Sequence, residues 1–228
     1  MERLKDIRGA IFDLDGTLLD SMGIWAEIDR RFLKRRGIAL PDDYIDIMKS
    51  MEFNRAAEYT IRRFGLRETP AQLMAEWTQM SQEAYAREIE LKDGVRAFLD
   101  CLAENGIKIA AATSCTEELF VPALRRGGIE RHFLTVVTTR EVGAGKHSPA
   151  VFLRAAQNLG LEPGQCAVFE DTLQGVRTAG RAGFVTVGVY DESSAAEQEN
   201  IRREANFYIR SFLEFTPLLG GDQHGEGE

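Results

Sequence analysis

The chain has 228 residues, of which 44% are apolar and 28% are charged, a composition typical of a globular protein that can bury a sizeable core. It contains 28 lysines and arginines against 36 aspartates and glutamates, so its net charge is −8. This balance argues against a nucleic-acid-binding surface, which is basic, but it allows a small anionic substrate to bind at a locally positive site.

Cysteine usage and the N-terminal residues favour an intracellular setting. The three cysteines, at positions 101, 115 and 166, show no paired spacing, which argues against a disulfide framework and fits a reducing compartment. Residues 1–8 are rich in charge and lack the apolar core of a signal peptide, and no stretch approaches about 18 apolar residues. We therefore expect a cytoplasmic protein that neither enters a membrane nor binds nucleic acid.

The first 90 residues change pattern once. An apolar run, Gly9–Leu14, predicts a buried strand that stops at a turn of Asp15 and Gly16. From residue 21 to about residue 90, apolar side chains recur at helical spacing, as at Trp25, Ile28 and Phe32. This block therefore predicts a small bundle of helices.

Strands and helices alternate from residue 94 onward. Such alternation indicates parallel strands joined by right-handed crossovers, so the chain predicts an α/β fold with a Rossmann-like parallel sheet core of residues 1–19 and 92–219. The all-helical block, residues 20–91, is then an insert over the carboxyl ends of the strands, and the Gly- and Glu-rich residues 220–228 predict a disordered tail. The predicted strands after the insert are 107–112, 133–138, 166–169, 184–189 and 206–209, and the predicted helices are 95–105, 117–126, 149–159 and 173–182.

Paired acids follow two of the predicted strands. Asp13 and Asp15 stand two positions apart at the exit of the first strand, and Glu170 and Asp171 follow strand 166–169. Taken alone, Asp15 could start a turn, and Asp171 with Thr172 is explained more simply as a helix cap. Because ligands of parallel sheets bind outside the carboxyl ends of the strands, four acids converging there predict a site for a hard cation such as Mg²⁺.

Two further features at the strand ends suit an anionic ligand. Thr113 and Ser114 follow strand 107–112, where a hydroxyl and free N–H groups can hold a phosphate, although these residues could also cap the helix beginning near Glu117. Lys146 precedes helix 149–159. Its ammonium would balance the carboxylates if it reached the same crevice, whereas most lysines are simply solvated.

In this order and spacing, these features resemble the motifs of the haloacid dehalogenase-like hydrolase superfamily, in the branch that carries a helical cap after the first strand. That branch includes phosphoglycolate phosphatases and beta-phosphoglucomutases. The resemblance covers about residues 7–190, and residues 168–183 are also similar to the branch. The matching residues are Asp13-Leu14-Asp15-Gly16-Thr17 for the first motif, Thr113 for the second, Lys146 with Ser148-Pro149 for the third, and Glu170-Asp171 for the fourth.

The resemblance implies a role for each motif residue. Asp13 would be the nucleophile that forms an aspartyl-phosphate, and Asp15 would protonate the leaving oxygen and deprotonate the attacking water. The implied cofactor is Mg²⁺, and the implied reaction is the hydrolysis of a small phosphomonoester, such as a sugar phosphate or a similar metabolite. The implied metal-binding residues are Asp13, Asp15, Glu170 and Asp171, and the implied phosphate-binding residues are Thr113, Ser114 and Lys146.

The acid at position 15 favours phosphoryl chemistry, because dehalogenating relatives lack an acid two residues after the nucleophile. The alternative is a beta-phosphoglucomutase-like sugar-phosphate mutase. Mutases of this branch carry a His about a dozen residues after the nucleophile and a cap Arg that grips the distal phosphate. This chain has Trp25 and Phe53 near those places, with Arg55 close by, so a phosphatase is the preferred prediction.

Residues of the helical insert are expected to set substrate specificity, and the entrance turn, Leu18–Trp25, and the insert segment Lys49–Arg55 are expected to face the active site. The candidate substrate residues are Trp25, Lys49, Phe53 and Arg55. For the two aromatic residues, packing in the core of the insert is the favoured alternative, and for the lysine it is a solvated surface position.

Two expectations concern the surface. The basic run Lys34-Arg35-Arg36 predicts the solvated end of a helix, where cations complement the helix dipole. No exposed apolar segment demands a protein partner, so we expect a monomer that binds a small phosphorylated metabolite.

Overall fold

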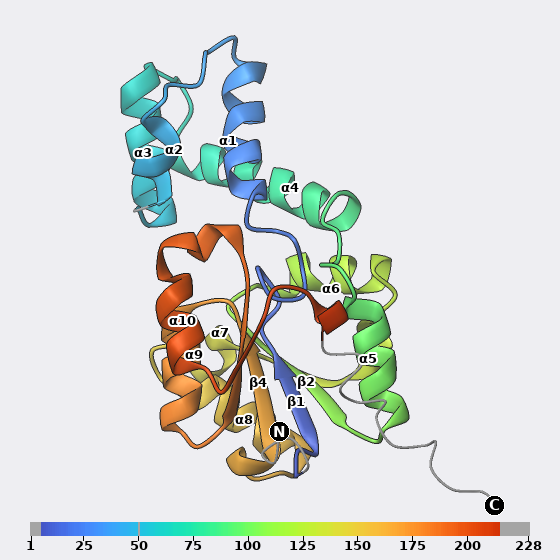
Figure 1. The fold of residues 1–228 in the computed structure, drawn as a ribbon. Helices are drawn as coiled ribbons and strands as arrows, with labels where there is room; N and C mark the ends of the chain where they lie inside the picture. Colours follow the sequence, from blue (N-terminus) through green and yellow to red (C-terminus); the bar gives the residue numbers. More distant parts are fainter. Residues whose placement is uncertain (1–5, 50, 215–228) are drawn as a thin grey trace, which may run out of the picture. The chain divides into compact units, whose positions relative to one another are not determined.

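Six parallel strands form one sheet in the computed structural model, which describes residues 6–49 and 51–214. The sheet order is β3-β2-β1-β4-β5-β6, so the first strand of the chain lies between β2 and β4 (Figure 1). The strands are β1 Gly9–Phe12, β2 Lys108–Thr113, β3 Phe133–Thr138, β4 Cys166–Glu170, β5 Val185–Val189 and β6 Phe207–Ile209. This arrangement confirms the predicted Rossmann-like α/β fold.

The helices that accompany the sheet include two that the periodicity did not predict. The helices are α5 Val95–Glu104, α6 Glu117–Arg126, α7 Thr139–Val142, α8 Ala150–Leu159, α9 Leu173–Arg181 and α10 Gln198–Glu204. The unpredicted ones are α7, which has only four residues, and α10, in which Ile201 is the single apolar residue. Neither segment is long or apolar enough to show a helical stripe in the sequence.

Successive residues of β1 serve opposite faces of the sheet, because side chains alternate along a strand. Ile11 belongs to the apolar cluster formed with α8 and α9. Phe12 faces the other way, where it stacks on Phe169 with 4.4 Å between ring centroids and meets Phe98 of α5 edge-on. Since helices cover both faces, the strand is apolar throughout and shows no polar alternation.

The chain divides into two compact units. One is formed by the chain up to Ser21 together with the chain from Glu90 onward, and the other by Met22–Ile89. The tail predicted for residues 220–228 lies outside the described residues. Within the described part of the chain, no helix is both long and apolar enough to cross a membrane.

The unit Met22–Ile89 is all-helical over its described residues. Its core includes an edge-on contact between Phe32 and Trp77, with 5.5 Å between ring centroids. The last helix begins at a capping box formed by Thr69 and Gln72, with Pro70 at the first helical position. The helices are α1 Ile24–Arg35, α2 Tyr44–Lys49, α3 Phe53–Phe64 and α4 Pro70–Arg87.

The two aromatic candidates of the helical unit are both partly exposed. Trp25 is 43% exposed and Phe53 is 46% exposed. Trp25 shares helical spacing with Ile28 and Phe32, but only the latter two are buried. The core-packing alternative is therefore wrong for Trp25, whereas Phe53 lies at the margin of the core, with its ring centroid 5.7 Å from that of the buried Trp77.

Arg36 is not the solvated charge that the basic run predicted. Its guanidinium lies 3.8 Å from the centre of the Phe32 ring and pairs with Glu68 at 2.7 Å and Glu76 at 2.6 Å. Both carboxylates come from residues more than 30 positions away in the sequence, so the local pattern could not reveal them.

Candidate active site

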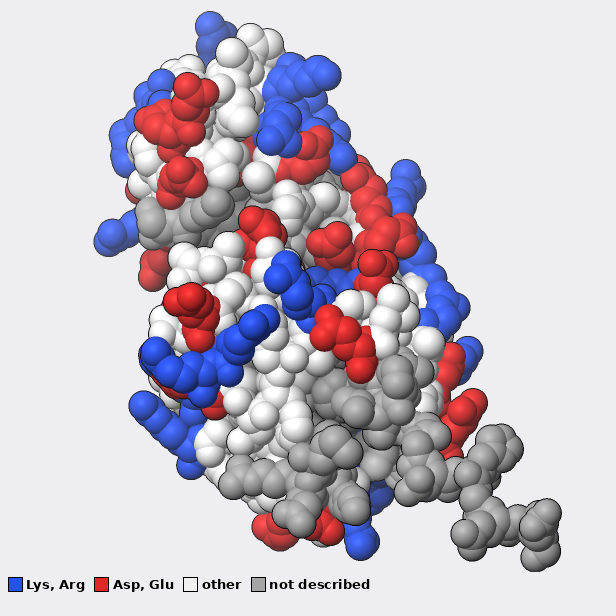
Figure 2. All heavy atoms as spheres, viewed as in Figure 1, with Lys and Arg blue, Asp and Glu red and all other residues white. Residues whose placement is uncertain are grey.

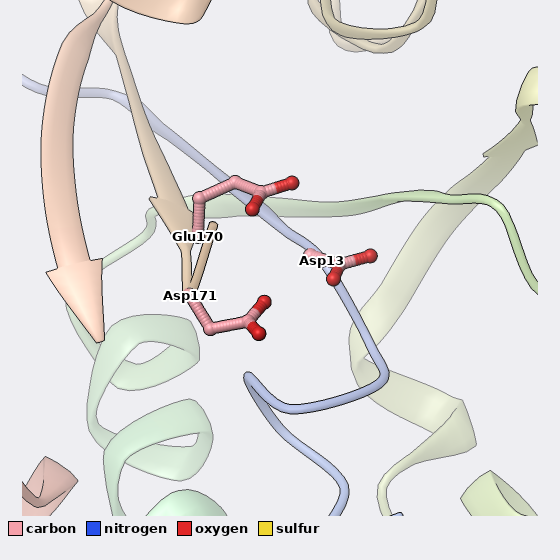
Figure 3. Close-up of side chains that lie close together, drawn as sticks. All are labelled: Asp13, Glu170 and Asp171. Atoms are coloured by element: carbon pink, nitrogen blue, oxygen red, sulfur yellow. The ribbon is translucent and has the colours of Figure 1, made fainter. Parts of the chain in front are cut away.

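Acids from β1 and β4 meet at the carboxyl edge of the sheet. The two strands are parallel neighbours, with Phe12 beside Phe169, and the N–H of Asp13 donates to the carbonyl of Phe169 at 3.0 Å. Carboxylate oxygens of Asp13, Glu170 and Asp171 lie within 4.8 Å of one another. Figure 3 shows these three side chains converging from the two strand ends. All three residues are at most 6% exposed, so the structure places three predicted metal-binding residues in one buried acidic cluster.

Lys146 reaches the acidic cluster from the loop between α7 and α8. Its ammonium lies 2.5 Å from Asp13 Oδ1 and also pairs with Glu170 Oε1. Burial by itself would lower the pKa of Lys146, but the two carboxylates hold that pKa above its ordinary value. Lys146 is therefore a permanent cation beside Asp13.

With all three carboxyl groups ionised, the acidic cluster would hold more negative charge than Lys146 can balance. Burial raises the pKa of Asp13 to about 7, with Lys146 opposing the rise and Glu170 adding to it. Burial also raises the pKa of Asp171 well above its usual value, and the neighbouring carboxyl groups add to this effect. Three ionised carboxylates against one ammonium leave two negative charges unpaired. A divalent cation would fit this deficit, because Mg²⁺ prefers oxygen ligands and a bound cation favours the ionised carboxylates.

Glu170 differs from its neighbour in the acidic cluster because both of its oxygens are already bound. Thr172 donates to Oε2 through its N–H at 3.1 Å and its hydroxyl at 2.8 Å, while Lys146 pairs with Oε1. Asp171 accepts one hydrogen bond, from the hydroxyl of Thr17 at 3.2 Å. Thr172 also caps α9, as the sequence suggested, because its hydroxyl oxygen accepts a hydrogen bond from the N–H of Gly175 at 3.2 Å. The bonds of Thr172 to Glu170 and of Thr17 to Asp171 were not predicted.

Gly175 in α9 has no side chain, and this leaves room for the carboxylate group of Glu170. A Cβ on Gly175 would lie 2.5 and 2.6 Å from the two carboxylate oxygens of Glu170. We expect Gly175→Ala to lower the free energy of unfolding by about 2–4 kcal/mol, because it forces a buried charge away from its partners. Urea denaturation followed by circular dichroism measures this change.

The matched control is Gly180→Ala in the same helix, where the nearest atom to the new Cβ is 3.8 Å away. This substitution should stabilise the protein by about 0.5–1 kcal/mol, because alanine is the better helix former. Equal stability of the two alanine variants would show that Gly175 is not needed to accommodate Glu170.

Thr113 ends β2 and is fully buried, whereas Ser114 is exposed. The hydroxyl oxygen of Thr113 accepts a hydrogen bond from the N–H of Cys115 at 2.9 Å. No described residue accepts the hydroxyl proton of Thr113, so that proton can bond a ligand oxygen. Helix α6 begins after Thr116, so neither Thr113 nor Ser114 is its N-cap.

Asp15 is half-buried and lies in the turn that follows β1. Ser21, which is fully buried, donates its hydroxyl to Asp15 Oδ1 at 2.6 Å. The turn depends on Gly16, whose φ is +79° and whose N–H donates to the carbonyl of Leu19. The contact of Ser21 with Asp15 could not be predicted from the sequence, because no regular periodicity relates residues six positions apart across an irregular turn.

The four candidate substrate residues belong to the helical unit, which is a compact unit separate from the one that contains the sheet. Trp25 lies on α1, Phe53 and Arg55 lie on α3, and all three are exposed. Lys49 is the last residue of α2, and its side chain is outside the described part of the structure. Contact between these four residues and a substrate therefore stays a prediction.

Known proteins are similar to this chain in sequence and in fold. The family model of the haloacid dehalogenase-like hydrolases matches residues 10–189, which include both pairs of acids. A phosphoglycolate phosphatase from Yersinia pestis is 30% identical over 96% of each chain, and a beta-phosphoglucomutase from Mycobacterium tuberculosis is 28% identical over 87% of each chain. The crystal structure of a HAD family hydrolase from Deinococcus radiodurans, with bound phosphate and sodium, has a TM-score of 0.74 at 24% identity, covering 94% of this chain and 95% of that one.

Proposed function

Since the chain belongs to the haloacid dehalogenase-like hydrolase family, we propose that it is a Mg²⁺-dependent phosphatase that hydrolyses a small phosphomonoester through an aspartyl-phosphate on Asp13. The observation that carries this proposal is the contact of Lys146 with Asp13 inside the buried acidic cluster. The contact pairs a carboxylate nucleophile with a fixed cation, and the remaining negative charge calls for a divalent ion.

The first half-reaction transfers the phosphoryl group to Asp13. A carboxylate oxygen of Asp13 attacks phosphorus, and the bond between phosphorus and the ester oxygen of the substrate breaks. Asp15 gives its proton to that oxygen as it leaves, and Ser21 holds the Asp15 carboxyl in place with its 2.6 Å hydrogen bond. Lys146 and the free hydroxyl proton of Thr113 stabilise charge on the phosphoryl oxygens.

The second half-reaction returns the enzyme to its starting state. Asp15, now ionised, takes a proton from a water molecule, and the oxygen of that water attacks phosphorus. The bond between phosphorus and Asp13 breaks, which releases inorganic phosphate and restores the Asp13 carboxylate. Asp15 is then protonated again, as the next cycle requires.

The acidic cluster offers a specific set of oxygens for the metal. When bound, Mg²⁺ would neutralise charge on the phosphoryl oxygens. We assign its protein ligands to Asp13 and Asp171, together with the backbone carbonyl of Asp15, which the family resemblance implies. Glu170 is left out because its two oxygens are bound to Thr172 and Lys146. This assignment removes the side chains of Asp15 and Glu170 from the predicted set of metal ligands. The role of Glu170 is then to position Lys146.

A sugar-phosphate mutase is the alternative, since some relatives carry the name beta-phosphoglucomutase. A mutase must hold a second phosphate while the first is transferred, and basic side chains serve that purpose. Trp25 and Phe53 stand near the places where mutases of this branch have a His and an Arg, and neither carries a charge, although Arg55 on α3 is close to the second place. The phosphatase is therefore preferred, with a sugar phosphate or a similar phosphorylated metabolite as its substrate.

Phosphate release from a panel of phosphomonoesters tests the proposal. The panel contains sugar phosphates, phosphoglycolate, nucleotides and an aryl phosphate, each assayed with Mg²⁺ and with a chelator. We expect release with Mg²⁺ and a loss of about 100-fold or more with the chelator, because the acidic cluster cannot otherwise stay fully ionised. Conversion of a hexose 1-phosphate into the 6-phosphate without release would identify a mutase. Release that is insensitive to the chelator would exclude the metal assignment.

A further inference from the structure

The chain crosses between its two units twice, and the two crossings are hydrogen-bonded to each other. The N–H of Lys92 donates to the carbonyl of Leu18 at 2.9 Å, and the N–H of Asp20 donates to the carbonyl of Glu90 at 3.0 Å. An antiparallel bridge between the residues at positions 19 and 91 lies between these bonds. We call this pair of segments the linker ribbon, and it comprises residues 18–21 and 90–92.

The side chain of Lys92 ties the linker ribbon to the end of β5. Its ammonium lies 2.7 Å from Asp191 Oδ2 and donates to the carbonyl of Tyr190 at 2.6 Å. The other oxygen of Asp191 accepts from the N–H of Ser193 at 2.9 Å and from its hydroxyl at 2.5 Å. The Lys92 and Asp191 side chains are only 17% and 6% exposed, so the two paired charges are largely buried.

The net pKa shift of Asp191 supports this pairing. Burial alone would raise the pKa of the Asp191 carboxyl, but its bonds to Lys92 and Ser193 hold the pKa below its usual value. Asp191 therefore stays ionised at the carboxyl edge of the sheet, one strand away from the acidic cluster. Because both of its oxygens are bound, it is not an additional metal ligand.

The linker ribbon also carries Ser21, which contacts Asp15, the residue proposed to act as both general acid and general base. Ser21 is the last residue of the outgoing segment, and its hydroxyl binds the carboxyl of Asp15. Thr17, directly before the ribbon, donates to Asp171 of the acidic cluster. The linker ribbon therefore carries a hydrogen-bond donor to the Asp15 carboxyl.

We propose that Lys92 and Asp191 form a clasp that fixes the linker ribbon to the end of β5 and positions the carboxyl of Asp15 through Ser21. This inference rests on the proposed function, because Asp15 is a group of that reaction. Lys92 and Asp191 touch no reacting atom, so both are positioning residues. A buried ion pair suits this task, since breaking it leaves an unpaired buried charge and is strongly unfavourable.

The same linker ribbon provides a matched control. Arg126 pairs with Glu90 at 2.8 Å, but the Glu90 side chain is 75% exposed. Exposed ion pairs of this kind contribute little to stability. Arg126→Met therefore removes an ion pair from the returning segment without removing the clasp.

Hydrogen–deuterium exchange of the full chain tests the clasp without reference to activity. In Asp191→Asn, we expect the ribbon amides of Asp20 and Lys92 to exchange about 10-fold faster or more, because their hydrogen bonds open more often. The double variant Lys92→Met/Asp191→Asn should show the same increase, and it contains no unpaired buried charge that could prevent folding. Arg126→Met should exchange like the wild-type chain. Wild-type exchange at both amides in the double variant would overturn the proposal.

Steady-state kinetics on an aryl phosphate test the positioning of Asp15. We expect kcat to fall about 10-fold in Asp191→Asn while KM stays within about twofold, because a misplaced proton donor slows the chemical steps. Lys92→Arg should retain most of the wild-type kcat, since it keeps the charge. Faster exchange with an unchanged kcat would overturn the link to Asp15. Absence of phosphatase activity in the wild-type chain would refute the proposed function instead, and the exchange result would still decide whether the clasp exists.

Discussion

Replacing Asp13 with asparagine is expected to abolish turnover and to leave the fold intact. The amide cannot accept the phosphoryl group as the carboxylate does, so phosphate release should fall by about 10⁴-fold or more. Stability should not fall, because burial raises the pKa of Asp13 to about 7 and the substitution removes a carboxyl from a crowded acidic cluster. Initial rates with Mg²⁺ and the midpoint of thermal unfolding in chelator measure the two effects.

Two variants separate the role of Asp13 from a general effect of charge. Asp20→Asn changes an exposed carboxyl in the same stretch of chain and should keep wild-type turnover. Asp15→Asn should still form some aspartyl-phosphate but turn over poorly, because it lacks the group that activates water. Substantial turnover by Asp13→Asn would refute its assignment as the nucleophile.

The largest pH effect on stability outside the acidic cluster is expected from Asp29 of α1. Asp29 is 9% exposed, and no described residue is hydrogen-bonded to its carboxyl group. Burial raises the pKa of this carboxyl group to about 7. In the unfolded chain this carboxyl ionises near pH 4, so the folded state holds a proton that the unfolded state loses. The contribution of Asp29 to the free energy of unfolding should therefore fall as pH rises from about 4 to about 7, by up to a few kcal/mol.

Asp29→Asn should remove this dependence. We expect the variant to match the wild-type chain near pH 4 and to unfold about 5 °C higher at pH 8, because it buries no charge. Differential scanning calorimetry across this pH range measures the difference. Asp42→Asn, which changes an exposed carboxyl of the same unit, should behave as the wild-type chain does. A pH-independent difference between Asp29→Asn and the wild-type chain would show that Asp29 is not protonated in the fold.

The strands and the motif acids could be predicted because their signals are local. Parallel strands covered on both faces give short apolar runs, and the residue after each run lies at the carboxyl edge of the sheet. The sequence therefore placed Asp13, Glu170 and Asp171 on one edge, and the structure shows their carboxylates within 4.8 Å. Lys146 was a weaker prediction, because a lysine in a loop shows no pattern that distinguishes it from a solvated one.

The supporting contacts of the site could not be predicted, because they depend on tertiary proximity. Lys92 and Asp191 are 99 positions apart, and nothing in either local sequence points to the other. The need for glycine at position 175 arises only when α9 packs against the side chain of Glu170. Periodicity likewise grouped Trp25 with the buried residues of α1, although the side chain lies at the exposed margin of that stripe.

The pairing of charged side chains could not be predicted from the sequence either. On the face of the molecule drawn in Figure 2, basic and acidic side chains of the described residues are interspersed. The net charge of −8 does not reveal the buried contact between Lys146 and Asp13, or the ion pairs of Arg36 with Glu68 and Glu76. A total over the whole chain averages over such local arrangements, so only the fold shows which charges act on one another.

The place of β1 at the centre of the sheet sets an order of events during synthesis. This strand emerges from the ribosome first, but its neighbours β2 and β4 begin only at Lys108 and Cys166. The helical unit, Met22–Ile89, is complete before either neighbour has been made, and its contacts are local in sequence. We therefore expect the inserted helices to fold first, while the apolar segment that leads to Asp13 stays unpaired until β2 and β4 have been synthesised.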